Sequence, residues 1–373
     1  MRVLIDYRPA LRERTGVGEW VHSLACALAA RGEEHLLDLA LFSSSWKDRP
    51  TLPPPIRTID RRVPVRVLNY CWHRLGWPPV EWIARERFDV VHSPHPLMMP
   101  SAHAARVVTV HDLDFLDHPQ HAISEVRRDY ASLIRRHVGS ADHVVVPSCF
   151  TGKEVERRLG VPPERITVCT NGAPDWTPRR TWPESGDILF VGSLTPRKNV
   201  GALLDAYRLL IDDDPDHPPP GMVLAGPATS QSADWLSAID APPLAGRVRW
   251  TGYLDKAALR RLYENAAVLV LPSWHEGFGL PVVEAMTIGV PVVASNRGAL
   301  PEVVGDAGLT VDPASPAQLA AAIKRMVRDI PFARACAERG FQQAAKFSWH
   351  AAADALVRAY EKTVTAAAEK RSP

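Results

Sequence analysis

Two glutamates in a glycine-rich segment are the residues whose types and spacing most directly suggest chemistry. Seven residues separate Glu276 from Glu284, and Gly277 and Gly279 follow the first glutamate. Pro281 is typical of the first turn of a helix, whose free N–H groups attract a phosphate or another anion. Carboxylates repel such an anion but suit the paired hydroxyls of a sugar or a ribose. Alternatively, Glu284 is only a favourable charge in the first turn and Glu276 a loop residue. Both interpretations fit this segment.

A pair of adjacent cations lies upstream in the sequence Gly-Ser-Leu-Thr-Pro-Arg-Lys-Asn, residues 192–199. This segment follows an expected strand and precedes an expected helix, which places Arg197 and Lys198 at the carboxyl end of the strand. Two cations there can balance the charge of a diphosphate leaving group. The alternative is an exposed Arg-Lys pair in a loop, which is common.

Short apolar runs alternate with helical patterns along the whole chain. Such runs are typical of parallel strands that are covered on both faces. The sequence therefore predicts an α/β fold of two doubly wound, Rossmann-like domains that face a central cleft. The expected helices include 20–30 and 200–211. The expected strands are 3–5, 89–93, 106–110, 143–146, 166–168, 188–191, 222–225, 248–250, 268–271 and 290–294.

A proline-rich stretch without periodicity, residues 174–186, interrupts this pattern and is the expected linker. It separates an N-terminal domain, 1–173, from a C-terminal domain, 187–346. Residues 347–373 form the expected last helix. The length of 373 residues agrees with two domains.

Composition excludes several classes of protein. Hydrophobic residues make up 46% of the chain and the formal net charge is +2, which argues against disorder and against a nucleic-acid binder. The five cysteines are dispersed without zinc spacing, which favours a reducing compartment. No apolar run approaches the ~20 residues that span a bilayer, and the N-terminus leaves no room for a signal peptide. The sequence predicts a cytoplasmic protein that at most lies on the inner face of the plasma membrane.

The segment 57–87 is rich in arginine and tryptophan. Its arginine excess indicates either a solvated basic face or a docking surface for an anionic acceptor or an anionic leaflet. Its tryptophans have the spacing of an interfacial helix, but Pro78-Pro79 interrupts that helix and favours a buried loop-and-helix segment. The residues concerned are Arg57, Arg61, Arg62, Arg66, Trp72, Arg74, Trp77, Trp82 and Arg85.

Several motifs in the same order resemble the retaining GT-B glycosyltransferases of family 4, the group 1 glycosyltransferases, over almost the whole chain. The two glutamates lie within His-Glu-Gly-Phe-Gly-Leu-Pro and the following helix, downstream of the Arg-Lys segment. Gly16-Val17-Gly18 resembles the glycine loop of the family, and Val110-His111-Asp112 resembles its His loop. Phe347-Ser348-Trp349 resembles the start of the terminal segment, which in the family packs back across the cleft.

The resemblance implies a role for each matched residue. Arg197 and Lys198 would hold the diphosphate of a nucleotide-sugar, Glu284 the ribose, and Glu276 the hydroxyls of the transferred sugar. Gly18 would allow the diphosphate to approach closely, and His111 would lie near the sugar; a core histidine is the alternative there. The implied catalytic residues are His111, Arg197, Lys198 and Glu276. The implied nucleotide-sugar site comprises Gly16, Gly18, Gly192, Arg197, Lys198, Gly277, Phe278, Gly279, Leu280 and Glu284.

The resemblance also implies that the donor keeps its anomeric configuration and that the departing phosphate takes the acceptor's proton. Asp112-Leu113-Asp114 has the Asp-x-Asp spacing of metal-dependent sugar transferases. Because it lies in the His loop and two cations already supply positive charge, we expect neither a metal ion nor another cofactor.

Within the family, the N-terminal phrase Thr15-Gly16-Val17-Gly18-Glu19-Trp20 is most similar to the mannosyl- and rhamnosyltransferases of bacterial surface polysaccharides. This favours GDP-mannose as donor and a glycan, glycolipid or small-molecule acceptor. The alternatives are a nucleotide-sugar epimerase on the same fold and a catalytically silent nucleotide-sugar-binding protein. A dinucleotide-dependent oxidoreductase is disfavoured because the glycine loop lacks the third glycine.

Overall fold

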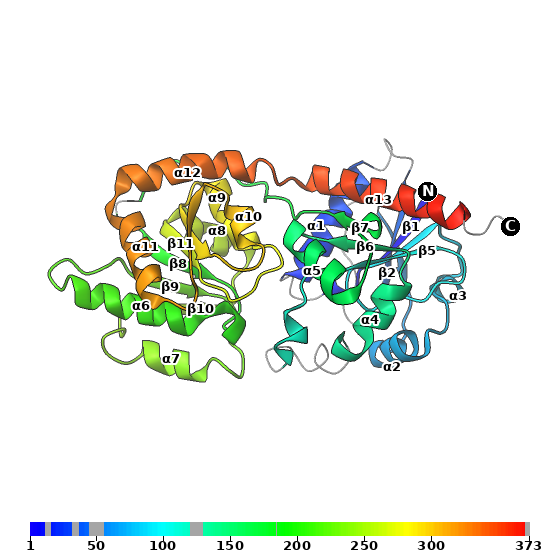
Figure 1. The fold of residues 1–373 in the computed structure, drawn as a ribbon, viewed down its shortest axis with the longest axis horizontal. Helices are drawn as coiled ribbons and strands as arrows, with labels where there is room; N and C mark the ends of the chain where they lie inside the picture. Colours follow the sequence, from blue (N-terminus) through cyan, green and yellow to red (C-terminus); the bar gives the residue numbers. More distant parts are fainter. Residues whose placement is uncertain (12–15, 32–36, 45–55, 120–129, 184, 370–373) are drawn as a thin grey trace. The chain divides into compact units, whose positions relative to one another are not determined.

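The computed structural model of the chain describes residues 1–11, 16–31, 37–44, 56–119, 130–183 and 185–369. It divides into two compact units, Met1–Gly172 together with Ser348–Pro373, and Ala173–Phe347 (Figure 1). Each unit is built on a parallel β-sheet with helices packed against it. The predicted α/β class with two Rossmann-like domains is therefore confirmed.

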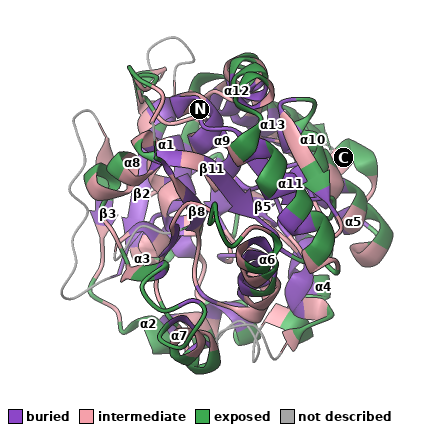
Figure 2. Ribbon diagram, turned by 90° about the vertical axis from the view of Figure 1, so that its left-hand side faces the viewer, coloured by how far each residue is buried: buried purple, intermediate pink, exposed green. Residues whose placement is uncertain are grey.

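Among the described residues, the first unit has one sheet of seven parallel strands in the order β3-β2-β1-β4-β5-β6-β7. The order of the strands reverses between β1 and β4, where Leu4 pairs with Val91. Figure 2 shows these strands as mostly buried, with helices that are buried on one side and exposed on the other. The strands are β1 (Arg2–Asp6), β2 (Asp38–Ser43), β3 (Arg57–Asp60), β4 (Val90–Ser93), β5 (Ala105–Thr109), β6 (His143–Val146) and β7 (Ile166–Val168).

The C-terminal helix α13 belongs to the first unit. Its residues Ala353, Leu356 and Tyr360 are buried in the same core as α1, and the Tyr360 hydroxyl lies 2.6 Å from Nδ1 of His92 on β4. The predicted return of the last helix to the N-terminal domain is confirmed. The helices of this unit are α1 (Val17–Ala30), α2 (Val65–Tyr70), the π-helical turn η2 (Cys71–Leu75), α3 (Val80–Ala84), α4 (Ala131–Ser140), α5 (Cys149–Leu159) and α13 (Trp349–Glu369).

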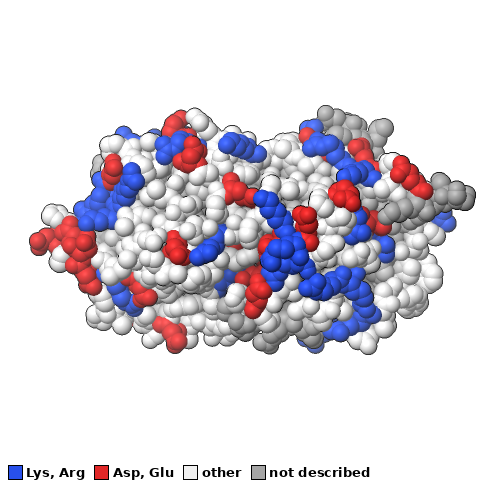
Figure 3. Space-filling model, viewed as in Figure 1, with Lys and Arg blue, Asp and Glu red and all other residues white. Residues whose placement is uncertain are grey.

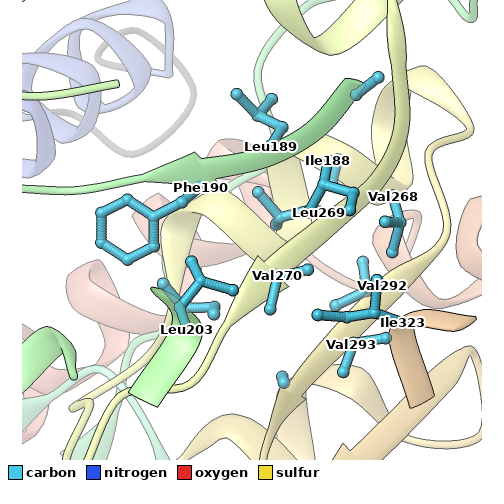
Figure 4. Packing of buried hydrophobic residues seen from close by; sticks show 14 of the residues in the cluster. Ile188, Leu189, Phe190, Leu203, Val268, Leu269, Val270, Val292, Val293 and Ile323 are labelled. Atoms are coloured by element: carbon cyan, nitrogen blue, oxygen red, sulfur yellow. The ribbon is translucent and has the colours of Figure 1, made fainter. Parts of the chain in front are cut away.

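In the second unit, six parallel strands of the described chain form a sheet in the order β10-β9-β8-β11-β12-β13, and the order reverses between β8 and β11. Figure 4 shows how Phe190, Leu269 and Val292 from the strands pack with Leu203 and Ile323 from two covering helices. The strands are β8 (Asp187–Val191), β9 (Met222–Ala225), β10 (Val248–Gly252), β11 (Ala266–Leu271), β12 (Val292–Ser295) and β13 (Gly308–Val311). The helices are α6 (Val200–Asp213), α7 (Ala233–Ile239), α8 (Lys256–Glu264), α9 (Leu280–Ile288), α10 (Leu300–Val304), α11 (Pro316–Arg328) and α12 (Ile330–Ala344).

Three strands differ from the sequence prediction, because β2, β3 and β13 were not expected. β3 and β13 lie at sheet edges and are only partly buried, so they lack the continuous apolar run of a central strand. β2 does carry such a run, Leu39 to Phe42, and it is buried.

The described residues of the expected linker, 174–183 and 185–186, belong to the second unit. The Arg179 amide donates to the Ile288 carbonyl at 3.0 Å, and its Nη1 donates to the Ala266 carbonyl at 2.7 Å. The Trp176 ring contacts Tyr263 with ring centroids 5.7 Å apart.

The tryptophan-rich segment is only partly the buried loop and helix that the sequence favoured. Trp72 is fully buried, and its Nε1 donates to the Pro78 carbonyl at 3.0 Å. Trp77 and Trp82, in contrast, are 56% and 63% exposed. The helix is interrupted between Leu75 and Val80, as expected, but the turn η2 already ends before Gly76, which has a φ of 66°, and the two tryptophans lie outside the core.

Candidate functional site

The carboxyl edge of the second sheet brings together the two segments that the sequence singled out. The loop after β8 and the loop after β11 lie side by side, because the Trp274 amide donates to the Arg197 carbonyl at 2.9 Å. The Asn199 side-chain amide ties them again by donating to the Pro272 carbonyl at 3.1 Å. β8 and β11 are the pair at which the strand order reverses, the position where doubly wound sheets bind ligands.

Arg197, Lys198 and Glu276 form one ionic cluster at this edge. Arg197 Nη1 lies 3.1 Å from Glu276 Oε2, and Lys198 Nζ lies 2.5 Å from Glu276 Oε1. Arg197 Nη1 also donates to the His275 carbonyl at 2.6 Å. The Glu276 side chain is buried, whereas that of Arg197 stays 25% exposed. Two cations around one carboxylate leave the cluster with one net positive charge.

The cluster keeps Glu276 ionised. Burial raises the pKa of this carboxyl group, but the charges of Lys198 and Arg197 outweigh burial and lower the pKa from 4.5 to about 2. The sequence predicted separate partners for the cations and for Glu276 and did not predict this mutual contact. Glu276 follows Lys198 by 78 positions and Arg197 by 79. Spacing along the sequence gives no sign of a contact over such a separation.

The start of helix α9 adjoins the cluster and requires a glycine. Gly279 precedes the helix with φ of 110°, and a Cβ there would lie 2.7 Å from Leu300 Cδ2. The N-cap residue Gly279 has no side chain that could cap this helix start. Pro281 lacks an N–H group and the Val282 amide donates to the Gly279 carbonyl at 3.0 Å, so the Leu280 amide and the positive end of the helix dipole are what suit an anion here. Phe278 is buried and packs on Phe347, leaving its backbone as the part that faces the loop. Gly192 lies beside Lys198, since a Cβ there would be 3.3 Å from Lys198 Cε.

Glu284 lies in the second turn of α9, and no acidic residue lies in the first turn. The alternative in which Glu284 is a first-turn charge is therefore wrong. Its Oε2 accepts a hydrogen bond of 2.7 Å from the Tyr263 hydroxyl. Burial raises the pKa of Tyr263 well above its ordinary value, so that the hydroxyl stays protonated as a donor. The sequence analysis missed Tyr263, because an aromatic residue on the buried face of α8 is usually a core residue.

The predicted residues of the first unit lie near the carboxyl edge of its sheet. His111 follows β5, and its Nε2 donates to the Pro94 carbonyl at 3.0 Å, which leaves Nδ1 without the proton. Burial lowers the pKa of His111 to about 4, so the ring is neutral at pH 7. Gly16 precedes α1 with φ of 50°. Gly18 packs against the chain itself, because a Cβ there would lie 2.7 Å from the Pro9 carbonyl oxygen.

The carboxyl edge of the first sheet also holds a buried ion pair, as the second sheet does with Glu276. Asp6, at the end of β1, is fully buried and accepts from Arg8 Nε at 2.8 Å and from Arg8 Nη2 at 2.6 Å. Arg8 Nη1 donates to Asn69 at 2.8 Å, and His95 Nε2 lies 3.5 Å from Asp6. Although burial raises the pKa of Asp6, Arg8 and His95 hold it well below its ordinary value.

The two carboxylates of Asp112-Leu113-Asp114 are engaged locally. Asp112 Oδ1 lies 3.3 Å from the Asp114 amide, and Asp114 Oδ1 lies 3.1 Å from His118 Nδ1. Within the described part of the chain, no three His, Cys, Asp or Glu side chains are grouped so that they could hold a metal ion. Whether the protein works without a metal ion stays a prediction.

Comparisons with known proteins assign the family. The family model "Glycosyltransferase Family 4" matches residues 14–175, and "Glycosyl transferases group 1" matches residues 185–329. The chain is 29% identical to the O-antigen chain mannosyltransferase B of Escherichia coli, over 97% of this chain and 100% of that protein. It is 31% identical to a glycogen synthase of Mycobacterium tuberculosis, over 96% of this chain and 94% of that protein.

A solved structure agrees with this assignment. The sucrose-phosphate synthase of Thermosynechococcus elongatus has the same fold, with a TM-score of 0.80 and 22% identity over 98% of this chain and 100% of that chain. The chain therefore belongs to the GT-B glycosyltransferases of family 4, the group 1 glycosyltransferases.

Proposed function

We propose that this protein transfers a hexosyl group from a nucleotide-sugar to a hydroxyl group of a glycan or glycolipid acceptor, with retention of configuration and without a metal ion. The observation that carries the proposal is the cluster of Arg197, Lys198 and Glu276, whose net positive charge lies beside the uncapped start of α9. Such an edge favours a diphosphate and, next to it, a group rich in hydroxyls.

In the proposed reaction, the bond between the anomeric carbon and the diphosphate oxygen breaks, and a bond from that carbon to the acceptor oxygen forms. The acceptor's proton passes to the departing phosphate, so no dedicated base is needed. Arg197 and Lys198 stabilise the negative charge that develops on the leaving group. The backbone from Gly277 to Leu280 orients the sugar and the phosphate.

The remaining site residues hold the donor. Glu284, fixed by Tyr263, binds the ribose hydroxyls, and Glu276 binds hydroxyls of the transferred sugar. The role proposed for His111 is that of a neutral hydrogen-bonding group for the sugar, in keeping with its lowered pKa. Gly16 and Gly192 let the backbone approach the nucleotide-sugar closely. Gly18, which the sequence assigned the same role, instead makes room for the Pro9 carbonyl oxygen.

The proposed donor is GDP-mannose, and the proposed setting is the synthesis of a bacterial surface polysaccharide in the cytoplasm. The similarity to the mannosyltransferase of Escherichia coli supports this donor, because it spans 97% of this chain. A reducing compartment agrees with the cysteines, since no disulfide links them within the described residues.

The donor can be tested by thermal unfolding of the purified protein with GDP, GDP-mannose, UDP, UDP-glucose and their relatives. A donor present at a hundred times its dissociation constant should add about 2.7 kcal/mol to the free energy of unfolding. We expect the largest shift with GDP-mannose. A larger shift with a uridine compound would overturn the donor while leaving the class of reaction intact.

A further inference from the structure

Exposed large apolar side chains are concentrated in the segment from Val65 to Trp82. Eleven large hydrophobic side chains are exposed in the described part of the chain, and six of them lie within this segment. Soluble proteins scatter such residues singly, whereas a group of them marks an interaction surface. We call these six residues the aromatic patch: Val65, Val67, Tyr70, Leu75, Trp77 and Trp82.

The aromatic patch is anchored firmly to the first unit. Leu68, Trp72 and Val80, from the same helices and turn, are buried in a core that also includes Phe42 of β2. The Trp77 and Trp82 rings contact each other edge to face, with centroids 6.2 Å apart. The exposed side chains therefore project from a backbone whose other side is buried.

A hydrogen-bonded tie joins the two ends of the segment. Arg61 Nε donates to the Ile83 carbonyl at 2.9 Å, and its Nη2 donates to the Ala84 carbonyl at 3.0 Å. These bonds bring the residues just before α2 next to the end of α3. The exposed residues of α2, η2 and α3 thus belong to one region of the surface.

Positive charge surrounds the aromatic patch. Residues 61–85 contain five arginines and one acidic residue, Glu81. Glu81 is buried and turned toward the Ser101 hydroxyl and the amides of residues 102 and 103. Arg62, Arg66 and Arg85 are exposed and form no ion pair within the described residues. The exposed charge of residues 61–85 is therefore positive, and Glu86, which follows them, is paired with Arg57.

Helix α4 extends this basic surface. Its exposed Arg136 donates to the His73 carbonyl in η2, which places the helix directly beside the segment, and Arg135 is exposed next to it. Figure 3 shows Lys and Arg side chains over α4 and α5 with acidic side chains beside them, because Arg157 and Arg158 of α5 pair with Glu154 and Asp117. The positive charge that continues beyond the segment is therefore that of Arg135 and Arg136 on α4.

We propose that the aromatic patch and its arginines form a membrane-docking surface that binds an anionic lipid leaflet. Tryptophan, tyrosine and aliphatic side chains enter the boundary between headgroups and acyl chains, while arginines bind the anionic headgroups. A soluble anion would use the arginines but leave the apolar side chains in water. A second copy docking through the same patch would bring the arginines of both copies together. The inference does not depend on the proposed function.

Docking of this kind is peripheral. Among the residues that the structure describes, no helix is long and apolar enough to cross a membrane. The expected binding is therefore reversible and depends on both lipid charge and ionic strength.

Sedimentation with vesicles of phosphatidylcholine, with and without phosphatidylglycerol, tests the inference. We expect the protein to bind the vesicles that contain phosphatidylglycerol and to dissociate at high salt. Arg62→Gln with Arg66→Gln should weaken the partition roughly 25-fold, about fivefold for each arginine removed. Trp77→Ser with Trp82→Ser should weaken it at least as much.

Matched controls come from the second unit. Arg180→Gln with Arg247→Gln removes two exposed arginines there, and Leu209→Ser with Ile330→Ser removes two exposed apolar side chains. Both pairs should leave vesicle binding unchanged, and thermal unfolding should show that every variant is folded. No vesicle binding, equal binding to both kinds of vesicle, or equal losses in patch and control variants would overturn the proposal. So would a dimer, detected by light scattering, that only the tryptophan variants dissociate and that does not bind vesicles.

Discussion

The two units each place a buried carboxylate against an arginine at the carboxyl edge of a parallel sheet, but the two clusters differ in charge. Asp6 pairs with Arg8, which is two residues away and whose side chain is 9% exposed. Glu276 pairs with both Arg197 and Lys198, which come from another loop. The first cluster is balanced, whereas the second carries an excess positive charge.

We interpret the first cluster as a structural ion pair and propose the second as a ligand site. Arg8 donates hydrogen bonds to Asp6 and Asn69. Its guanidinium carbon lies 5.0 Å from the centroid of the Trp72 ring. Because its charges balance, that cluster has no excess positive charge to attract an anion. The cluster around Glu276 adjoins an uncapped helix start that favours one. A charged cluster at the carboxyl edge of a sheet is therefore not enough to indicate an anion site. The net charge of the cluster must also be positive.

The largest expected effect comes from removing the two cations of the second cluster, Arg197 and Lys198. Arg197→Ala with Lys198→Ala should weaken binding of a nucleoside diphosphate at least a hundredfold, because each charge-assisted contact contributes ~1.5–3 kcal/mol. Titration calorimetry measures this directly. Arg180→Ala with Arg247→Ala is the control and should bind normally.

The double variant also leaves Glu276 buried without a partner, so it should be less stable. Adding Glu276→Gln to it should restore stability but not binding. Unaltered affinity in the double variant would show that these cations do not hold the diphosphate.

The balanced cluster should respond in the opposite way. Arg8→Ala leaves Asp6 buried and unpaired, which should lower the free energy of unfolding by about 3–5 kcal/mol. Affinity for nucleoside diphosphate should stay unchanged. Denaturant unfolding and calorimetry on the same preparation separate the two quantities. A loss of affinity without a loss of stability would reverse the distinction between the clusters.

Acid should reveal the ionised state of Glu276. Its pKa in the folded protein is about 2, against an ordinary value of 4.5. The ionised group therefore adds stability that is fully present above pH 4.5 and is lost as the pH falls toward 2, by about 3 kcal/mol. The difference in unfolding free energy between the wild type and Glu276→Gln should decline over that interval and stay level above it. A difference that is constant from pH 6 to pH 2 would contradict the lowered pKa.

The two glutamates should affect the reaction differently. Glu284→Gln should weaken binding of the free nucleotide and of the nucleotide-sugar alike, because its proposed partner is the ribose. Glu276→Gln should lower turnover and yet tighten binding of the free nucleoside diphosphate, because it frees the donors of Arg197 and Lys198. Titrations of both variants with GDP would decide. Equal losses of affinity would refute this division of roles.

The smallest effect is expected at Tyr263. Tyr263→Phe removes the hydrogen bond to Glu284 and should weaken nucleotide affinity about fivefold, or ~1 kcal/mol. Tyr207→Phe is a matched control, because the Tyr207 hydroxyl donates to the Pro220 carbonyl at 2.8 Å, away from the site. Both variants should lose similar stability. If both also lost the same affinity, Tyr263 would have no positioning role.

The class of fold, and the two segments that meet in the candidate site, could be predicted from the sequence for physical reasons. Central parallel strands such as β11 are apolar throughout, which makes them visible in the sequence. Gly279 followed by Pro281 is likewise a sequence pattern that is typical of a helix start. Edge strands such as β3, Arg57–Asp60, lack the apolar run.

Contacts between distant segments could not be predicted in the same way. The pairing of Glu276 with both cations depends on how two loops meet, and the tie from Tyr263 to Glu284 depends on how α8 packs against α9. The outward turn of Trp77 and Trp82 also depends on which face of the segment the core covers.

The central claim is that the surplus cations of the second unit stabilise the leaving diphosphate in place of a metal ion, in a transfer that retains configuration. The most direct test is transfer from GDP-α-mannose in excess chelator, with the configuration of the new linkage read from its NMR coupling constant. The account predicts an α-linked product, undiminished activity in chelator, and normal activity of Asp114→Asn. A β-linked product, or activity that chelator abolishes and magnesium or manganese restores, would contradict it.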